Sequence, residues 1–84
     1  MIYEIEEAIR KGYSVKFRRV PAHVVSHDYN IRIEVICDDH HEARDISPIC
    51  IGDSTRSFED LVCWTLDDLI RRMDTRLMIY EVLQ

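Results

Sequence analysis

The sequence predicts an α+β domain in the order helix, strand, strand, strand, helix, with a three-stranded antiparallel sheet covered by a long C-terminal helix. Three observations lead to this prediction. Apolar residues near both ends recur at intervals of three and four, which is the period of an amphipathic helix. Between them, two runs alternate apolar and polar residues, as half-buried strands do. The chain has 84 residues, the size of one domain, so residues 1–84 are treated as a single domain.

The N-terminal segment predicts a short helix followed by the first strand. Three isoleucines share one helix face: Ile2, Ile5 and Ile9. Gly12 can end this helix because glycine readily adopts the left-handed conformation that follows a helix. Residues 13–18 then alternate apolar with polar side chains, and Pro21 ends the strand because proline has no backbone donor.

The middle of the chain predicts a hairpin. Residues 29–37 alternate most clearly and form the second strand. The run Asp38-Asp39-His40-His41 is expected to be the turn, because aspartate tolerates turn geometry. Residues 42–51 return as the third strand, and Pro48 places that strand at an edge of the sheet or beside a bulge.

The C-terminal segment predicts the helix that covers the sheet. Its apolar stripe consists of Val62, Leu66, Leu69, Met73, Leu77 and Tyr80. Ser57 can cap its first turn, and Asp60 favours the positive end of the helix dipole. An unbroken helix from Phe58 to Leu83 would be roughly 39 Å long at 1.5 Å per residue. That length exceeds what a domain of this size requires, so we expect a break or bend near Asp74.

These elements define an expected core between the sheet and the long helix. The strand residues that should face the helix are Tyr13, Val15, Phe17, Ile31, Ile33, Val35 and Ile46. The helix residues that should face the strands are Leu61, Val62, Leu66, Leu69 and Met73.

Charge and composition narrow the classes of function. The net charge is −5 although five basic residues fall within residues 10–19, so the rest of the chain is strongly acidic. Phosphate-binding domains are usually basic, whereas an acidic surface suits a basic protein partner. No apolar run approaches the roughly 20 residues that cross a bilayer, and the acidic, periodic N-terminus is unlike a signal peptide. We therefore expect a protein of the host-cell cytoplasm, and the odd count of three cysteines argues against a disulfide framework.

Two patterns have spacings compatible with zinc. His23 and His27 are separated by three residues, and Cys37 and His40 by two. A structural zinc site usually has a Cys-rich knuckle, which this chain lacks. We therefore expect no metal and no cofactor.

A catalytic site is also not expected. Cys63 or Cys50 could pair with a histidine as nucleophile and base, but no glycine-flanked nucleophile accompanies either cysteine. Asp67 and Asp68 point about 100° apart on a helix, so their carboxylates do not converge. The sequence therefore predicts a protein that is not an enzyme.

Nucleic-acid binding is an alternative, because double-stranded RNA-binding domains share this order of elements. Such domains place lysines at the start of the second helix to reach phosphates, where this chain has Glu59 and Asp60. The basic residues that could still bind RNA are Lys16, Arg18, Arg19 and Arg32.

The acidic hairpin turn is the second candidate surface. Asp38, Asp39 and Glu42 enclose His40 and His41, and closely spaced carboxylates imitate phosphates electrostatically. The other reading of this turn is an ordinary polar hairpin.

Residues 2–17 resemble the opening of small prophage-encoded anti-CRISPR proteins that inhibit the type II Cas nuclease. The similarity extends through residues 30–35 into the acidic turn and covers residues 2–46. The resemblance implies an α-β-β-β-α inhibitor whose acidic surface occupies the DNA-recognition site of the nuclease. It also implies that the loop between the second and third strands contacts the nuclease; here this loop is residues 38–42.

The leading hypothesis is therefore a phage-type inhibitor that binds and blocks a host protein such as a CRISPR effector. The partner-binding residues would be Asp38, Asp39, His40, His41, Glu42, Asp67 and Asp68. A third possibility is a homodimeric accessory domain in which the segment Leu77–Leu83 joins the two copies.

Overall fold

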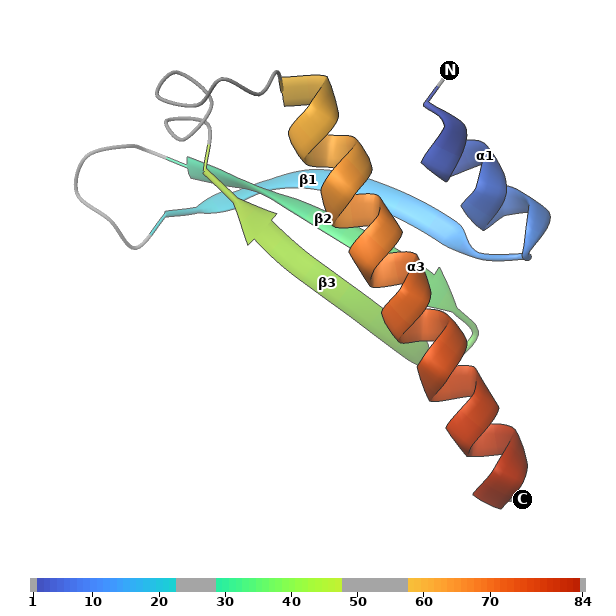
Figure 1. Ribbon diagram of the computed structural model, residues 1–84. Coiled ribbons are helices and arrows are strands. Elements are labelled where there is room, and N and C mark those ends of the chain that lie inside the picture. Colours follow the sequence, from blue (N-terminus) through green and yellow to red (C-terminus); the bar gives the residue numbers. More distant parts are fainter. Residues whose placement is uncertain (1, 23–28, 48–57, 84) are drawn as a thin grey trace.

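The computed structural model describes residues 2–22, 29–47 and 58–83. The elements in these ranges are α1 (Tyr3–Arg10), β1 (Ser14–Pro21), β2 (Tyr29–Cys37), β3 (His40–Ile46) and α3 (Phe58–Leu83) (Figure 1). Their order confirms the α+β class and the predicted succession of helix, three strands and helix.

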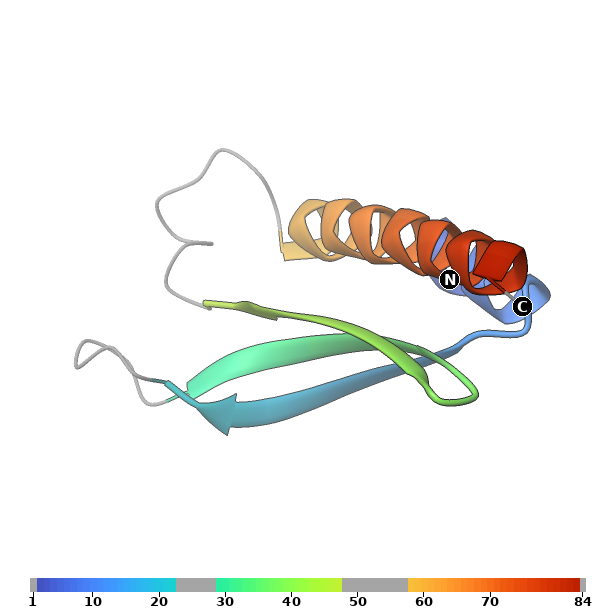
Figure 2. The same cartoon turned by 90° about the horizontal axis from the view of Figure 1, so that it is seen from below.

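The three strands form one antiparallel sheet in the order β1-β2-β3. Its register pairs Phe17 with Ile33 and Ile33 with Arg44, so these three residues lie on the same face. Figure 2 shows α1 and α3 on one side of the sheet. The side chains of residues 15, 33, 35, 44 and 46 therefore point towards the helices, and those of residues 16, 18, 32, 34 and 45 point the other way.

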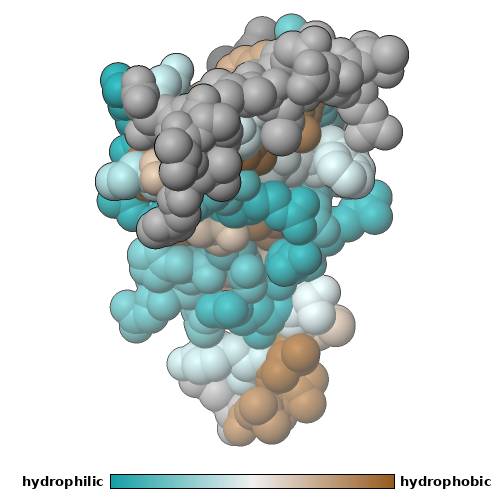
Figure 3. Space-filling view, turned by 90° about the vertical axis from the view of Figure 1, so that its left-hand side faces the viewer, coloured by the Kyte–Doolittle hydropathy of each residue, from teal (hydrophilic) through white to brown (hydrophobic). Residues whose placement is uncertain are grey.

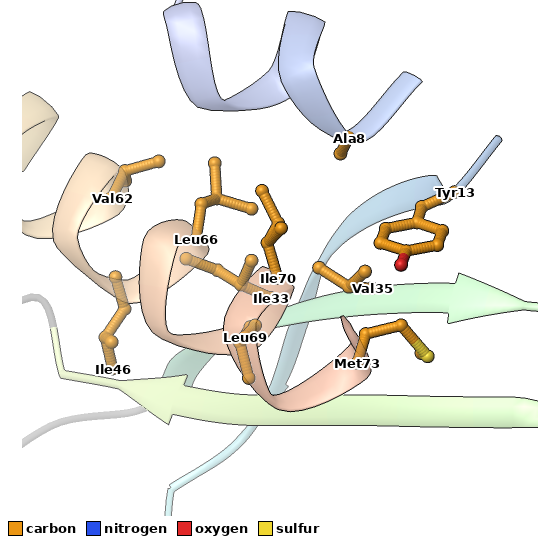
Figure 4. Close-up of a cluster of buried hydrophobic side chains, with 10 residues drawn as sticks. All are labelled: Ala8, Tyr13, Ile33, Val35, Ile46, Val62, Leu66, Leu69, Ile70 and Met73. Carbon is orange, nitrogen blue, oxygen red and sulfur yellow. The ribbon is translucent and has the colours of Figure 1, made fainter. Parts of the chain in front are cut away.

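A single apolar cluster between sheet and helices forms the core (Figure 4). Its buried members are Ala8, Tyr13, Ile33, Val35, Ile46, Val62, Leu66, Leu69, Ile70 and Met73. This cluster confirms most of the expected core, with Val15, Ile31 and Leu61 packed against it and only partly buried. Ala8 and Ile70 are core residues that the sequence pattern missed.

Phe17 is the exception among the expected core residues, because its side chain is 45% exposed. It is on the correct face, but β1 is an outer strand of the sheet, and α3 packs mainly over β2 and β3. Phe17 therefore lies beside the helix, in an open hollow that it shares with Ile2, Ile5, Phe58 and Val62.

Two turns define the ends of the strands. Gly12 has a φ of +85°, which confirms it as the left-handed residue after α1. The hairpin turn is shorter than expected: Asp38 and Asp39 form it, whereas His40 and His41 already belong to β3. Asp38 has a φ of 52°, a left-handed conformation that aspartate tolerates better than most residues. Pro48 and Ser57 lie outside the described residues.

The predicted break near Asp74 is wrong, because α3 is one helix of 26 residues. The length argument assumed that the helix would end where the sheet ends. Instead its C-terminal turns extend past the sheet (Figure 1), and the molecule is 45 Å long. Asp74 itself is held in place by hydrogen bonds from Lys11 and Tyr13.

Candidate functional site

The C-terminal turns of α3 expose an unusual amount of apolar surface. The exposed large side chains in these turns are Met78, Ile79, Tyr80, Val82 and Leu83. Val82 and Leu83 are 79% and 81% exposed, because none of the described strands lies beneath this part of the helix (Figure 1). Figure 3 shows the resulting hydrophobic surface at the end of the molecule. Contiguous apolar patches on a folded surface commonly mark interaction sites.

The acidic hairpin turn lies directly beside this apolar end. The His40 ring packs edge-on against the Tyr80 ring, with their centroids 5.0 Å apart. An open hollow between turn and helix is lined by Cys37, Asp38, Asp39, His40, Leu77, Tyr80 and Glu81. The structure thus joins two features that are distant in the sequence.

We call this combined area the hairpin–helix surface. It consists of Asp38, Asp39, His40, Leu77, Met78, Tyr80, Glu81, Val82 and Leu83. The signal for it in the sequence is the density of apolar residues after Arg76. Since the expected break at Asp74 would have turned this segment away, its position beside the hairpin was not predicted.

The other acidic residues predicted to contact a partner are occupied by arginines. Glu42 pairs with Arg76 at 3.0 Å, and Asp67 pairs with Arg71 at 3.2 Å.

Asp68 is engaged twice. Its Oδ2 atom lies 3.1 Å from Arg44 and 3.0 Å from Arg72. Asp67 and Asp68 are therefore both paired with arginines, and they lie on α3 away from the hairpin turn.

His41 is also separated from the other predicted contact residues. It pairs with Ile36 in the register of the sheet, and its side chain points to the face opposite α3. Among the described residues, the predicted acids that form no ion pair are Asp38 and Asp39 at the turn.

Three of the four basic residues proposed for nucleic-acid binding share the sheet face opposite the helices, where Arg18 is the register partner of Arg32, but acidic side chains lie among them. Arg18 pairs with Glu34 at 3.0 Å, and Arg32 forms two hydrogen bonds to Asp45, of 2.7 and 3.1 Å. Lys16 lies opposite Glu34 in the register.

Arg19 points to the face of the sheet that carries the helices, because it is the register partner of Ile31. There its guanidinium group stacks on the Tyr29 ring, 4.2 Å from the centroid. A continuous basic strip of the kind that follows a phosphate backbone is thus not assembled from these four residues.

The environment of Cys63 disfavours a nucleophilic thiolate. Burial raises the pKa of its thiol to about 11, assisted by a hydrogen bond with Glu4 and by the charges of Glu59 and Asp60. The thiol is therefore protonated at neutral pH. His40 contacts Tyr80, which lies roughly 25 Å further along α3 than Cys63 at 1.5 Å per residue, so His40 and the adjacent His41 are far from this thiol. Cys50 lies outside the described residues.

Within residues 2–22, 29–47 and 58–83, no group of three or more potential metal ligands is brought together. Cys37 and His40 are register partners at the base of the turn. His23 and His27 lie outside the described residues, so the expectation that they bind no metal stays a prediction.

Among the described helices there is none with the length and hydrophobicity of a membrane-spanning segment. No protein-family model, curated protein or solved structure matches the chain. The comparisons therefore assign no family to it.

Proposed function

We propose that this chain is a small non-enzymatic protein that binds a host protein through the hairpin–helix surface and inhibits it. The observation that carries the proposal is the exposed apolar end of α3 beside two carboxylates that form no ion pair in the described residues. A protein interface commonly has such an anatomy, with an apolar centre and a polar rim.

The apolar part would supply most of the binding free energy. Burying apolar surface contributes roughly 25 cal/mol per Å², and large aromatic side chains dominate interfaces. Tyr80 is suited to anchor the contact, because its ring is already held against His40 and loses little freedom on binding.

The acidic rim would select the partner. Asp38, Asp39 and Glu81 surround the hollow, and each is exposed. Such a rim favours a partner with lysines or arginines around an apolar pocket and accelerates the encounter. A site that recognises DNA has such basic residues, which supports the DNA-recognition surface of a CRISPR effector as the target. The acidic mimicry would then involve three carboxylates at one end of the molecule.

The experiment measures binding and inhibition separately. Immobilised protein is tested against purified CRISPR effectors by interferometry, and DNA cleavage is followed at increasing inhibitor concentration. Asp38→Asn/Asp39→Asn should weaken binding and reduce its salt dependence, and Tyr80→Ala should weaken it at every salt concentration. Asp67→Asn is the matched control, because that carboxylate is already paired with Arg71. Unimpaired DNA binding and cleavage by every effector tried would contradict the inhibitor function.

The same exposed side chains favour a second candidate, a homodimer joined through Leu77–Leu83. Two copies could bury their apolar ends against each other in an isologous contact. Light scattering distinguishes the candidates: a stable dimer that Leu83→Glu dissociates supports self-association, whereas a monomer at high concentration supports a different partner.

A further inference from the structure

In the part of the chain that the structure describes, the outer side of β3 is open to a further strand. Among the described residues, β3 pairs with β2 alone. Alternate residues of an edge strand direct their N–H and C=O groups outward, so the stretch from His40 to Arg44 offers backbone groups to another chain. An extended peptide can add to such an edge through main-chain hydrogen bonds.

An open groove lies between this strand and α3. Two ion pairs connect the elements, Glu42 with Arg76 and Arg44 with Asp68. The residues that line the groove are Glu42, Arg71, Arg72, Thr75, Arg76 and Ile79. A strand added to β3 would direct alternate side chains towards this flank of the helix. We call these six residues the arginine groove.

The charges around the groove favour an acidic occupant. Arg44, Arg71, Arg72 and Arg76 face three carboxylates, and a single oxygen of Asp68 serves both Arg44 and Arg72. A guanidinium group has five N–H donors, so these ion pairs leave donors available for another carboxylate. Arg71 and Arg72 expose 77% and 55% of their side chains. A locally positive groove is notable in a chain whose net charge is −5.

We propose that the arginine groove binds an extended acidic peptide segment of another protein, which adds a strand to the outer side of β3. Carboxylates of the peptide pair with Arg71 and Arg72, where bidentate geometry is available. An apolar side chain of the peptide packs on Ile79, which is half exposed. The site adjoins the hairpin–helix surface along α3 but includes none of the residues by which that surface was defined, and the hairpin–helix surface selects a partner of the opposite charge.

The test uses a short fluorescein-labelled peptide in which glutamate alternates with valine, with binding followed by anisotropy. Arg71→Gln/Arg72→Gln should weaken binding about tenfold or more. In this variant Asp68 still pairs with Arg44, so its carboxylate is not left without an arginine partner. Arg10→Gln is the matched control, because Arg10 forms the same kind of exposed i,i+4 pair with Glu6. It should leave binding unchanged, as should Asp38→Asn/Asp39→Asn on the hairpin–helix surface.

Two further measurements test strand addition itself. The same peptide with alternate backbone amides N-methylated should bind at least about tenfold more weakly. In addition, hydrogen exchange at the backbone amides of His41 and Ala43 should slow when the unmodified peptide binds. Equal affinity of the double arginine variant and the unmodified protein would overturn the proposal. So would equal binding of the N-methylated peptide, or tighter binding of a single-stranded RNA oligonucleotide by the same arginines.

Discussion

The Tyr13 hydroxyl group donates a hydrogen bond of 2.5 Å to Oδ1 of Asp74, 61 residues further along the chain. The other carboxylate oxygen, Oδ2, accepts a 2.6 Å hydrogen bond from the Lys11 ammonium group. This contact ties the junction of α1 and β1 to the middle of α3. It also gives a mid-helix aspartate, a residue of low helix propensity, a tertiary reason to remain helical.

Removing the hydroxyl group should weaken this connection without changing the core volume. Tyr13→Phe is expected to lower the free energy of unfolding by about 1.5 kcal/mol, the lower end of the range for a hydrogen bond to a charged group. Urea denaturation measures the change. Tyr3→Phe is the control, because Tyr3 is exposed on α1 and should change stability little. If Tyr13→Phe has the same effect with and without Asp74→Asn, the two side chains are not coupled.

The same carboxylate predicts a pH dependence of stability. Burial alone would raise the pKa of Asp74, but hydrogen bonds from Lys11 and Tyr13 outweigh it and lower the pKa below its usual value. A lowered pKa in the folded state stabilises the protein above the unfolded-state value of about 3.9, and this contribution is lost as pH falls through the folded-state pKa. Below about pH 4, Asp74→Asn should therefore lose less unfolding free energy per pH step than the unmodified protein. Parallel slopes for the two proteins would contradict the lowered pKa.

The core predicts a strong contrast along a single helix. Leu66 is fully buried, so Leu66→Ala should cost about 2–5 kcal/mol of stability. Leu83→Ala, in the same helix but largely exposed, should cost about 0.5 kcal/mol or less. Thermal or urea unfolding of both variants checks the contrast. Similar losses for both would show that α3 presents a different face to the sheet.

Cys63 should react slowly with alkylating reagents in the folded protein. With a thiol pKa of about 11, roughly one molecule in a thousand carries the reactive thiolate at pH 8. Iodoacetamide labelling, resolved by mass spectrometry of peptides, should therefore be much slower at Cys63 than in protein unfolded by guanidinium chloride. Glu4→Gln should increase the folded-state rate, since it removes a negative charge beside the sulfur. Labelling at the unfolded rate would show that the thiol is neither buried nor shifted.

The local periodicity of the sequence was sufficient to predict the order of helices and strands, but it did not predict the length of α3. The alternation in residues 29–37 and the stripe through Leu66 and Leu69 are short-range signals, and both were interpreted correctly. Asp74, where the break was expected, accepts hydrogen bonds from Lys11 and Tyr13, more than 60 residues away, and no local pattern records such partners.

The candidate site shows the same division between local and long-range information. The pairs Asp67–Arg71 and Asp68–Arg72 follow an i,i+4 spacing that the sequence already contains. The pairs Glu42–Arg76 and Asp68–Arg44 join β3 to α3 and become visible only when the chain is folded. For this reason the sequence did not reveal that Glu42 and Asp68 are paired with arginines of the other element.

The part of α3 that passes beyond the sheet has a further consequence. Helices in proteins gain most of their stability from packing rather than from intrinsic propensity, so residues 78–83 should fray more often than the turns above Ile33 and Val35. A molecule that binds these turns must also keep them helical, and the free-energy cost of that ordering reduces the net free energy of binding. Substitutions that stiffen the exposed turns should consequently tighten association even where they touch nothing on the other molecule.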